Sequence, residues 1–368
     1  MHAEQRQRAH ELLKSHHIQR ALFANPYSVT WLTGYAAPLQ VGPGPFAGGP
    51  PLVWYQDGEF TLIVIQTADT TGVNIPVTRY QGYSVQTPLT GPGNLAHIVA
   101  GLAGSAISHI LACEAQHVPA ALIPEGVSVL PIDGWLDPLR MLKTAEELEK
   151  LRRAFALTDL AHAAARQATH TGVREIDVWT AAHSAVQQAA GGRLPFGNDC
   201  VVSYREDNIG GWPLDLELHP GDSLMVDISV RVDGYWSDSC ATYYASEPDE
   251  RQKAMHRVAA GALEFASSLV KPGAAASEID RSVRKFIADA GYPVYPHHTG
   301  HGVGVSPHEE PRIVPYNTTV LEPGMVVMLE PGIYFPKEAA VRLEDALLVT
   351  AGGAEVLTRH DKSMGSMH

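Results

Sequence analysis

Four acidic residues interrupt apolar, strand-like segments between residues 220 and 350. They are Asp227, Asp238, Glu330 and Glu344. A single aspartate in such a segment is best explained by an edge strand or a solvent-facing position. Four interior carboxylates are costly unless something neutralises them together, because an unpaired charge is poorly tolerated away from water. This pattern therefore favours a fold in which strands from distant parts of the chain converge on a bound cation.

The first two acids belong to a predicted β-hairpin. Asp233-Gly234 is a two-residue turn signal, and it follows the apolar run Ser223–Val232. A turn at this place sets Asp238 opposite Ser229. Side chains alternate along a strand, so Asp227 and Asp238 point to the same side as diagonal neighbours, roughly 7–8 Å apart at the backbone. That separation suits two carboxylates that close on metal ions between them.

The other two acids lie in the segments Met325–Glu330 and Val341–Val349, both predicted as strands. Alternation along the second of these places Arg342 and Glu344 on one face. Between the two pairs of acids lies a stretch rich in glycine and histidine, which contains His297, His301 and His308. Taken alone, each of these histidines is best explained as part of a solvated, glycine-rich loop. Beside four carboxylates, His301 becomes a candidate metal ligand.

Five ligands of the types Asp, Asp, His, Glu and Glu offer mostly hard oxygen donors. Such a set favours manganese, with cobalt or zinc as alternatives. Carboxylates that bridge two ions recur in hydrolases whose paired metals lower the pKa of a shared water. We therefore expect two divalent metal ions.

The 368-residue chain is long enough for two domains. Residues 1–135 predict an α/β domain, with a helix at Ala3–Ser15 and strands near 21–24, 51–55 and 61–65. Residues 139–360 predict an α+β domain that starts with a capping box at Thr144 and Glu147. Its predicted helices are 145–171, 175–190, 249–270 and 277–291. The order of helix, glycine, helix and strands occurs twice, which predicts an internal duplication.

The tripeptide Glu175-Ile176-Asp177 returns as Glu278-Ile279-Asp280, in the second helix of each half. Two related halves would pack with a cleft between them. The loop Ala36–Pro51 is rich in proline and glycine.

Net charge and composition restrict the partners. The charge of -13 disfavours nucleic acid and anionic membranes. The polar N-terminus does not resemble a signal peptide, and no apolar run is long enough to span a bilayer, so we expect a cytoplasmic protein. The three cysteines form neither a disulfide pattern nor a zinc pattern.

At this point the residues resemble a known family, the pita-bread metallopeptidases, in the branch of Xaa-Pro aminopeptidase and prolidase. The resemblance covers most of residues 139–350, and the N-terminal region resembles the creatinase-type domain. Its motifs are Asp227 with Asp238 after Gly234-Tyr235, Gly300–Gly304 with His308–Pro311, Glu330–Tyr334, and Arg342–Asp345.

The resemblance implies roles for single residues. Asp227, Asp238, His301, Glu330 and Glu344 would bind two metal ions. Glu330 would also act as general base, and His308 would stabilise the tetrahedral intermediate or hold the substrate carbonyl. His297 matches a histidine near the site in prolidases. Arg342 would orient Glu344 or meet a substrate carboxylate. The family further implies a homodimer and small proline-containing peptides as substrates.

The sequence departs from the family pattern in three places. The histidine that usually precedes the first metal-binding strand is missing from Asp207–Pro213, and His219 does not align with it. We expect Trp212 or a residue of the partner chain to take its place. Cys240-Ala241 replaces the usual Thr-Arg pair. We expect Cys240 to be a small residue packed in the core. We expect the segment Ser363–His368 to be a disordered tail.

The motifs leave several functions open. Prolidase cleaves Xaa-Pro dipeptides, whereas Xaa-Pro aminopeptidase acts on longer peptides, and both share every motif above. The loop Ala36–Pro51 is a candidate for closing the far end of the cleft, which favours the dipeptidase. Alternatives are a metal-free, creatinase-like hydrolase and a non-catalytic protein of the same fold. The complete set of five metal ligands argues against the metal-free, creatinase-like hydrolase. A methionine aminopeptidase is disfavoured by the N-terminal domain.

Overall fold

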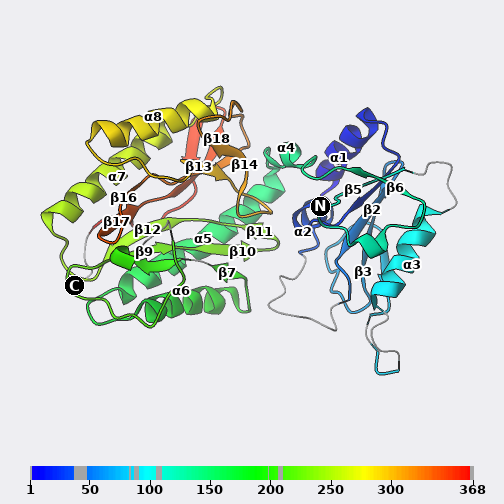
Figure 1. Ribbon diagram of the computed structural model, residues 1–368, viewed down its shortest axis with the longest axis horizontal. Helices are drawn as coiled ribbons and strands as arrows, with labels where there is room; N and C mark the ends of the chain where they lie inside the picture. The colour runs from blue at the N-terminus through cyan, green and yellow to red at the C-terminus, as the bar shows by residue number, and fades with distance from the viewer. Residues whose placement is uncertain are drawn as a thin grey trace. The chain divides into compact units, whose positions relative to one another are not determined.

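The chain folds into two compact units, Met1–Arg140 and Met141–His368, in a computed structural model (Figure 1). The structure describes residues 2–36, 48–82, 84–86, 91–104, 110–197, 199–205 and 210–364. The domain assignment to residues 1–135 and 139–360 stays a prediction. Among the described residues, none of the helices combines the length and apolar character needed to cross a lipid bilayer.

The first unit is built on one mixed six-stranded sheet in the order β4-β3-β2-β1-β5-β6. Strand β1 pairs antiparallel with β2 and parallel with β5. Its strands are β1 (Arg20–Phe23), β2 (Leu52–Gln56), β3 (Glu59–Ile65), β4 (Val77–Tyr80), β5 (Ile110–Cys113) and β6 (Ser128–Pro131). Its helices are α1 (Ala3–Ser15), α2 (Pro26–Thr33), α3 (Gly91–Ala103), the 3-10 turn η1 (Ala120–Leu122) and α4 (Asp137–Arg140).

The predicted elements of this unit are confirmed within one or two residues at their ends. The central strands are apolar because both faces are covered, and Leu22, Trp54 and Ile63 form part of one buried core. Residues 37–47, most of the loop Ala36–Pro51, lie outside the described part of the chain.

The second unit contains two pairs of long helices, and the two pairs flank its strands (Figure 1). Helix α5 begins with the predicted capping box, in which Thr144 Oγ1 accepts from the Glu147 amide and the Glu147 carboxylate accepts from the Thr144 amide. The helices are α5 (Ala145–Ala168), α6 (Glu175–Ala190), the 3-10 turn η2 (Ser203–Arg205), α7 (Glu250–Leu269) and α8 (Ala276–Asp289).

The strands of the second unit pair antiparallel in four small sheets, ordered β11-β10-β7, β12-β9-β8, β14-β13-β15-β18-β19 and β16-β17. In the first half they are β7 (Phe196–Gly197), β8 (Cys200–Val202), β9 (Ser223–Asp227), β10 (Ser229–Val232), β11 (Tyr235–Trp236) and β12 (Cys240–Tyr244). In the second half they are β13 (Gly300–Gly302), β14 (Glu309–Ile313), β15 (Val326–Leu329), β16 (Gly332–Phe335), β17 (Ala339–Arg342), β18 (Asp345–Thr350) and β19 (Gly353–Val356).

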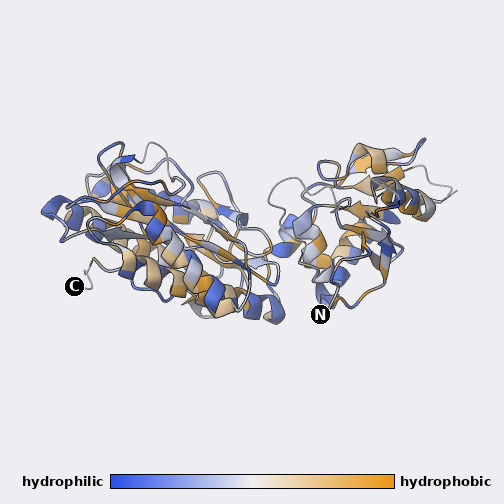
Figure 2. Cartoon of the chain, turned by 90° about the horizontal axis from the view of Figure 1, so that it is seen from below, coloured by the Kyte–Doolittle hydropathy of each residue, from blue (hydrophilic) through white to orange (hydrophobic). Residues whose placement is uncertain are grey.

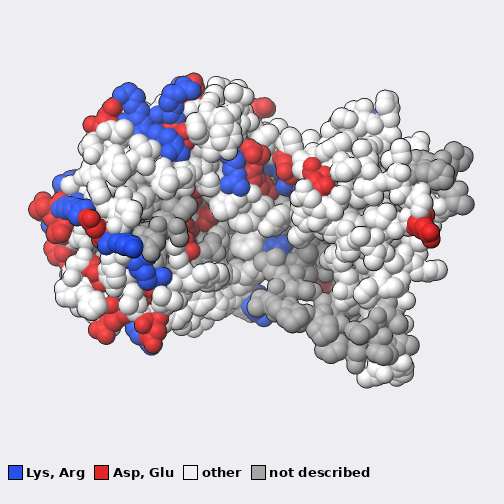
Figure 3. Space-filling view, in the orientation of Figure 1, with Lys and Arg blue, Asp and Glu red and all other residues white. Residues whose placement is uncertain are grey.

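Polar and apolar residues are distributed as this layering requires. Figure 2 shows the hydrophobic colours concentrated on the strands and the hydrophilic colours on outward parts of the helices. Basic and acidic side chains are interspersed over the second unit in Figure 3. Ion pairs one helical turn apart include Arg281–Glu278 and Lys285–Asp289 in α8.

The two halves of the second unit repeat the same backbone contacts. The Gly172 amide donates to the carbonyl of Leu218, and the Gly273 amide donates to the carbonyl of Leu321. Helices α6 and α8 follow these glycines at the same distance, so Glu175 corresponds to Ala276. The two copies of the shared tripeptide therefore lie two residues out of register and are not equivalent positions of the repeat. The repeat of helices and strands is itself present.

One predicted strand is wrong. The segment Val341–Val349 divides into β17 and β18, which belong to different sheets, and Leu343-Glu344 lie between them. The inference that Arg342 and Glu344 share a face by alternation therefore fails, because alternation holds only along a continuous strand.

Candidate metal centre

The predicted hairpin register in the first half is confirmed. Val232 pairs with Tyr235 around the Asp233-Gly234 turn, where both turn residues have positive φ. The same register continues into β9 and β12, where Asp227 pairs with Cys240. Ser229 therefore faces Asp238, and its Oγ donates to Asp238 Oδ1 over 2.9 Å.

The second half supplies three more side chains from separate places. His301 lies in β13 opposite Met328 of β15. Glu330 directly follows β15, and its amide donates to the carbonyl of Thr299 over 2.9 Å. The Glu344 amide donates to the carbonyl of Cys240 over 2.9 Å, so this bond joins the two halves at the site.

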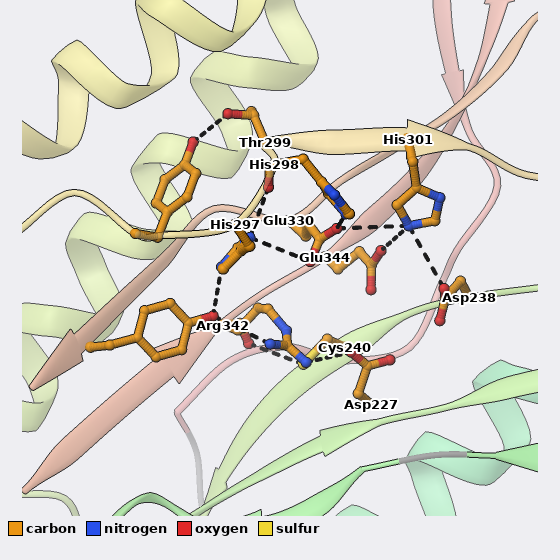
Figure 4. Close-up of polar contacts among 12 residues, drawn as sticks. Asp227, Asp238, Cys240, His297, His298, Thr299, His301, Glu330, Arg342 and Glu344 are labelled. Carbon is orange, nitrogen blue, oxygen red and sulfur yellow. Dashed lines mark hydrogen bonds and ion pairs between the residues drawn. The ribbon is translucent and has the colours of Figure 1, made fainter. Parts of the chain in front are cut away.

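The His301 imidazole lies among three carboxylates (Figure 4). Its Nε2 is 3.7 Å from Asp238 Oδ2, 3.7 Å from Glu330 Oε1 and 3.9 Å from Glu344 Oε1. Its Nδ1 is 2.9 Å from the carbonyl oxygen of Gly302, which suits a proton on Nδ1 and a lone pair on Nε2. Burial lowers the pKa of His301 well below its usual range, so the ring is neutral and able to bind a metal.

Asp227 is held by Arg342. Its Oδ2 accepts a bond of 2.5 Å from Arg342 Nη2, whereas its buried Oδ1 has no hydrogen-bond partner among the described residues. Burial raises the pKa of Asp227 to about 6 against the attraction of Arg342, and the charges of Asp199 and Glu330 raise it further. A buried carboxylate oxygen without a partner is a place where a cation fits.

The other carboxylates are also crowded by charge. Burial, and then mutual repulsion, raise the pKa of Asp238 and that of Glu344 well above the usual range. Burial alone would also raise the pKa of Glu330, but a hydrogen bond of 2.7 Å from His298 Nε2, together with nearby positive charge that includes Arg342, lowers it to about 2. A bound cation would relieve this repulsion, so the donor set fits divalent metal ions.

His308 is the exposed member of the site. Its ring centroid lies 4.1 Å from that of His301 and 5.7 Å from that of His298. Although the residue as a whole is exposed, loss of water around its ring, and then the charge of Arg312, lower the pKa of His308 to about 4. The neighbouring Glu309 anchors its loop, because the carboxylate lies 3.3 Å from Lys143 Nζ and accepts from the Ser306 amide over 3.1 Å.

Arg342 and His297 meet at a tyrosine. Tyr334 Oη lies 3.3 Å from Arg342 Nη1 and 2.9 Å from His297 Nε2. Arg342 thus contacts Asp227 and Tyr334, and its expected action on Glu344 or on a substrate stays a prediction. Burial lowers the pKa of His297 to about 4, against the attraction of Glu330.

Two groups of these residues have ligand atoms close enough to share one ion. They are Asp238, His301 and Glu344, and His298, His301 and His308. The sequence reasoning did not assign His298, Tyr334 or Asp199. His298 adjoins the noted His297, and that adjacency was the only signal for it. The contacts of Tyr334 and Asp199 depend on the packing of distant segments.

The departures from the family pattern have different outcomes. Residues 206–209 lie outside the described part of the chain. Trp212 is 75% exposed, and its role as a replacement for the missing histidine stays a prediction. Cys240 is fully buried in the core cluster, as expected. The start of the expected disordered tail is contradicted, because the carbonyl of Ser363 accepts from Arg166 Nη1 over 2.9 Å. Residues 365–368, the rest of that predicted tail, lie outside the described part of the chain.

A comparison with protein families decides the classification. The model of metallopeptidase family M24 matches residues 149–351, which include every residue of the cluster around His301. The chain belongs to metallopeptidase family M24. This M24 protein is therefore a metal-dependent peptidase, and its second unit has the pita-bread fold predicted from the motifs.

Curated relatives of this M24 protein include dipeptidases. It is 34% identical over 234 residues to the Xaa-Pro dipeptidase of Pyrococcus furiosus, a match that covers 63% of this chain and 67% of the relative. It is 36% identical over 244 residues to the probable dipeptidase PepE of Mycobacterium tuberculosis, which covers 63% of each chain.

Solved structures agree over nearly the whole chain. The prolidase of Pyrococcus horikoshii superposes with a TM-score of 0.83 at 26% identity, over 98% of this chain and 100% of the other. The X-Pro aminopeptidase of Thermotoga maritima superposes with a TM-score of 0.79 at 22% identity, over 98% of both chains. At 22% identity, the second match shows only that the two proteins share a fold.

Proposed function

We propose that this M24 protein is a dinuclear metallopeptidase that hydrolyses the peptide bond before proline, and that it acts on Xaa-Pro dipeptides as a prolidase. The observation that carries the proposal is the convergence of carboxylates from both halves around the Nε2 atom of His301. The similarity to the Xaa-Pro dipeptidase of P. furiosus supports the choice of substrate.

Two divalent ions would be held by Asp227, Asp238, His301, Glu330 and Glu344. We propose manganese, with cobalt or zinc as alternatives, because four of these five ligands are carboxylates. When bound, such ions supply Lewis acidity and lower the pKa of the water that attacks the peptide bond. The buried Oδ1 of Asp227, for which the described residues offer no hydrogen-bond partner, supports this ligand set.

Glu330 would be the general base. Its low pKa keeps the carboxylate ionised at neutral pH, which is the form that can accept a proton. The hydrogen bond of 2.7 Å between His298 Nε2 and Glu330 Oε1 fixes the orientation of that carboxylate. The proton would then pass to the leaving nitrogen of proline.

His308, His297 and Arg342 would handle the substrate. His308 is exposed beside His301, so its ring can approach the scissile carbonyl and donate a hydrogen bond as negative charge develops there. His297 and Arg342 would line the position of the substrate through their common partner Tyr334.

We further propose a homodimer in the cytoplasm, with small proline-containing peptides as substrates and no nucleic acid or membrane as partner. The proposed division of labour assigns residues 139–360 to catalysis, and residues 1–135 form a creatinase-type domain.

Rates on matched peptides test this function. The metal-stripped protein is supplied with manganese, cobalt or zinc in turn, and hydrolysis of Ala-Pro is compared with that of Ala-Pro-Ala. We expect hydrolysis of Ala-Pro with manganese and little of the tripeptide. A preference for the tripeptide would assign the protein to the Xaa-Pro aminopeptidases. A failure to cleave either peptide with two ions bound would reject the proposal.

A further inference from the structure

The segment that carries Glu344 lacks the support of a strand. Glu344 lies between β17 and β18, outside the paired residues of either strand. The Glu344 amide donates a hydrogen bond to the Cys240 carbonyl, and this bond fixes one point of the segment. A metal ligand needs its backbone held within a fraction of an ångström, so other contacts must complete the support.

Residues Leu357–Met364, here called the C-terminal strap, bind the residues that follow Glu344. The Leu357 amide donates to the Ala346 carbonyl over 2.8 Å, and the Ala346 amide donates to Thr358 Oγ1 over 3.3 Å. Asp345 accepts from Thr358 Oγ1 over 2.5 Å and pairs with Lys362 Nζ at 2.7 Å. The strap therefore holds the positions directly after Glu344 by backbone and side-chain bonds.

The other side of the strap is anchored on helix α5. Asp159 Oδ1 accepts from the amides of Arg359 and His360 over 2.8 and 2.9 Å, and it lies 3.1 Å from His360 Nδ1. Arg166 Nη1 donates to the carbonyls of Asp361 and Ser363 over 3.1 and 2.9 Å. Because α5 belongs to the first half, the strap ties the second half to it.

A histidine of the strap stacks on a histidine of helix α5. The rings of His162 and His360 are parallel within 10°, with centroids 3.9 Å apart, and both side chains are buried. His162 Nε2 lies 3.0 Å from the Ser239 carbonyl, and His360 Nε2 lies 3.5 Å from Ser239 Oγ. Ser239 directly follows Asp238, and its Oγ donates to the Glu344 carbonyl over 3.1 Å.

We propose that the C-terminal strap is a positioning element of the metal centre, which holds Asp238 and Glu344 in register through Ser239 and Asp345. The inference rests on the proposed metal site. The strap lies outside residues 149–351, the part that the family model matches. Outer contacts of this kind orient the residues that bind a metal, and their loss weakens metal binding.

The test measures metal affinity rather than turnover. Thr358→Val and His360→Phe keep the shape of each side chain and remove its hydrogen bonds. The full-length, metal-stripped variants are titrated with Mn²⁺ by calorimetry, and we expect the dissociation constant of at least one ion to rise about 10- to 100-fold. Excess Mn²⁺ should restore kcat. Arg152→Met, which removes the exposed pair with Glu355 between α5 and β19, is the matched control and should leave affinity unchanged.

Melting in EDTA separates positioning from stability. If Thr358→Val and His360→Phe lower the melting temperature of the metal-free protein but bind Mn²⁺ as tightly as the parent chain, the strap is merely structural and the proposal is overturned. A parent chain that binds two ions but cleaves no Xaa-Pro peptide would reject the proposed function and leave this inference standing.

Discussion

Metal binding should stabilise the protein less at acidic pH, because protons and metal ions compete for the same carboxylates. Without metal, burial raises the pKa of Asp227 to about 6. This raised pKa stabilises the metal-free fold at low pH, and that contribution is lost as the pH rises from about 4 through 6. A bound ion removes the proton, so the stabilisation gained from metal must increase with pH over the same window.

The magnitude follows from Asp227 alone. At pH 5 this carboxyl is mostly protonated in the metal-free protein, and displacing the proton costs about 1.4 kcal/mol more than at pH 7. One kcal/mol shifts the melting temperature of a unit of this size by about 2–4 °C, so we expect the shift caused by Mn²⁺ to be about 3–6 °C larger at pH 7 than at pH 5. The raised pKa values of Asp238 and Glu344 act in the same direction.

The assay is thermal unfolding with EDTA and with saturating Mn²⁺, at pH 5, 6 and 7. Comparing the two conditions at each pH cancels the titration of groups remote from the site. In Asp227→Asn the part of the pH dependence that comes from this carboxyl should disappear. A shift in melting temperature that is equal at pH 5 and pH 7, or larger at pH 5, would refute the reasoning.

Three substitutions test single roles. Glu330→Gln should lower kcat by about 10²- to 10⁴-fold, because it removes the proposed base, and turnover equal to that of the parent would reject this role. His308→Ala should lower kcat while inductively coupled plasma mass spectrometry finds two ions per chain, whereas loss of an ion would make His308 a ligand. Thr144→Ala removes the capping box of α5 and should cost about 1 kcal/mol of stability, measured by urea unfolding, with KM unchanged. A free energy of unfolding equal to that of the parent chain would show that the cap contributes nothing.

The parts of the fold that the sequence predicted well depend on local chemistry. The Asp233-Gly234 turn fixes the register of the whole hairpin, so the relation between Asp227 and Asp238 followed from a single dipeptide. The start of α5 followed from Thr144 and Glu147 for the same reason, because a capping box is complete within four residues.

The parts that failed depend on contacts between distant segments. Nothing local in Val341–Val349 shows that the chain leaves one sheet and joins another at Leu343-Glu344. Ser363 was predicted to be disordered because nothing near it in the sequence shows what holds it. Its partner is Arg166, which lies 197 positions earlier. The partner of Asp227 likewise became visible only when Arg342 was placed beside it.

The hydrogen bond from the Glu344 amide to the Cys240 carbonyl joins segments that are more than a hundred residues apart, and it lies beside a proposed metal ligand. Contacts at such sequence separation form slowly, since a long loop must close before they contribute any stability. The five proposed ligands come from both halves, so the complete set for a pair of ions exists only after the halves have docked. Uptake of the ions would mark the final step of maturation, so a refolding chain should pass through a compact, empty and inactive species whose lifetime is set by the docking of the two halves.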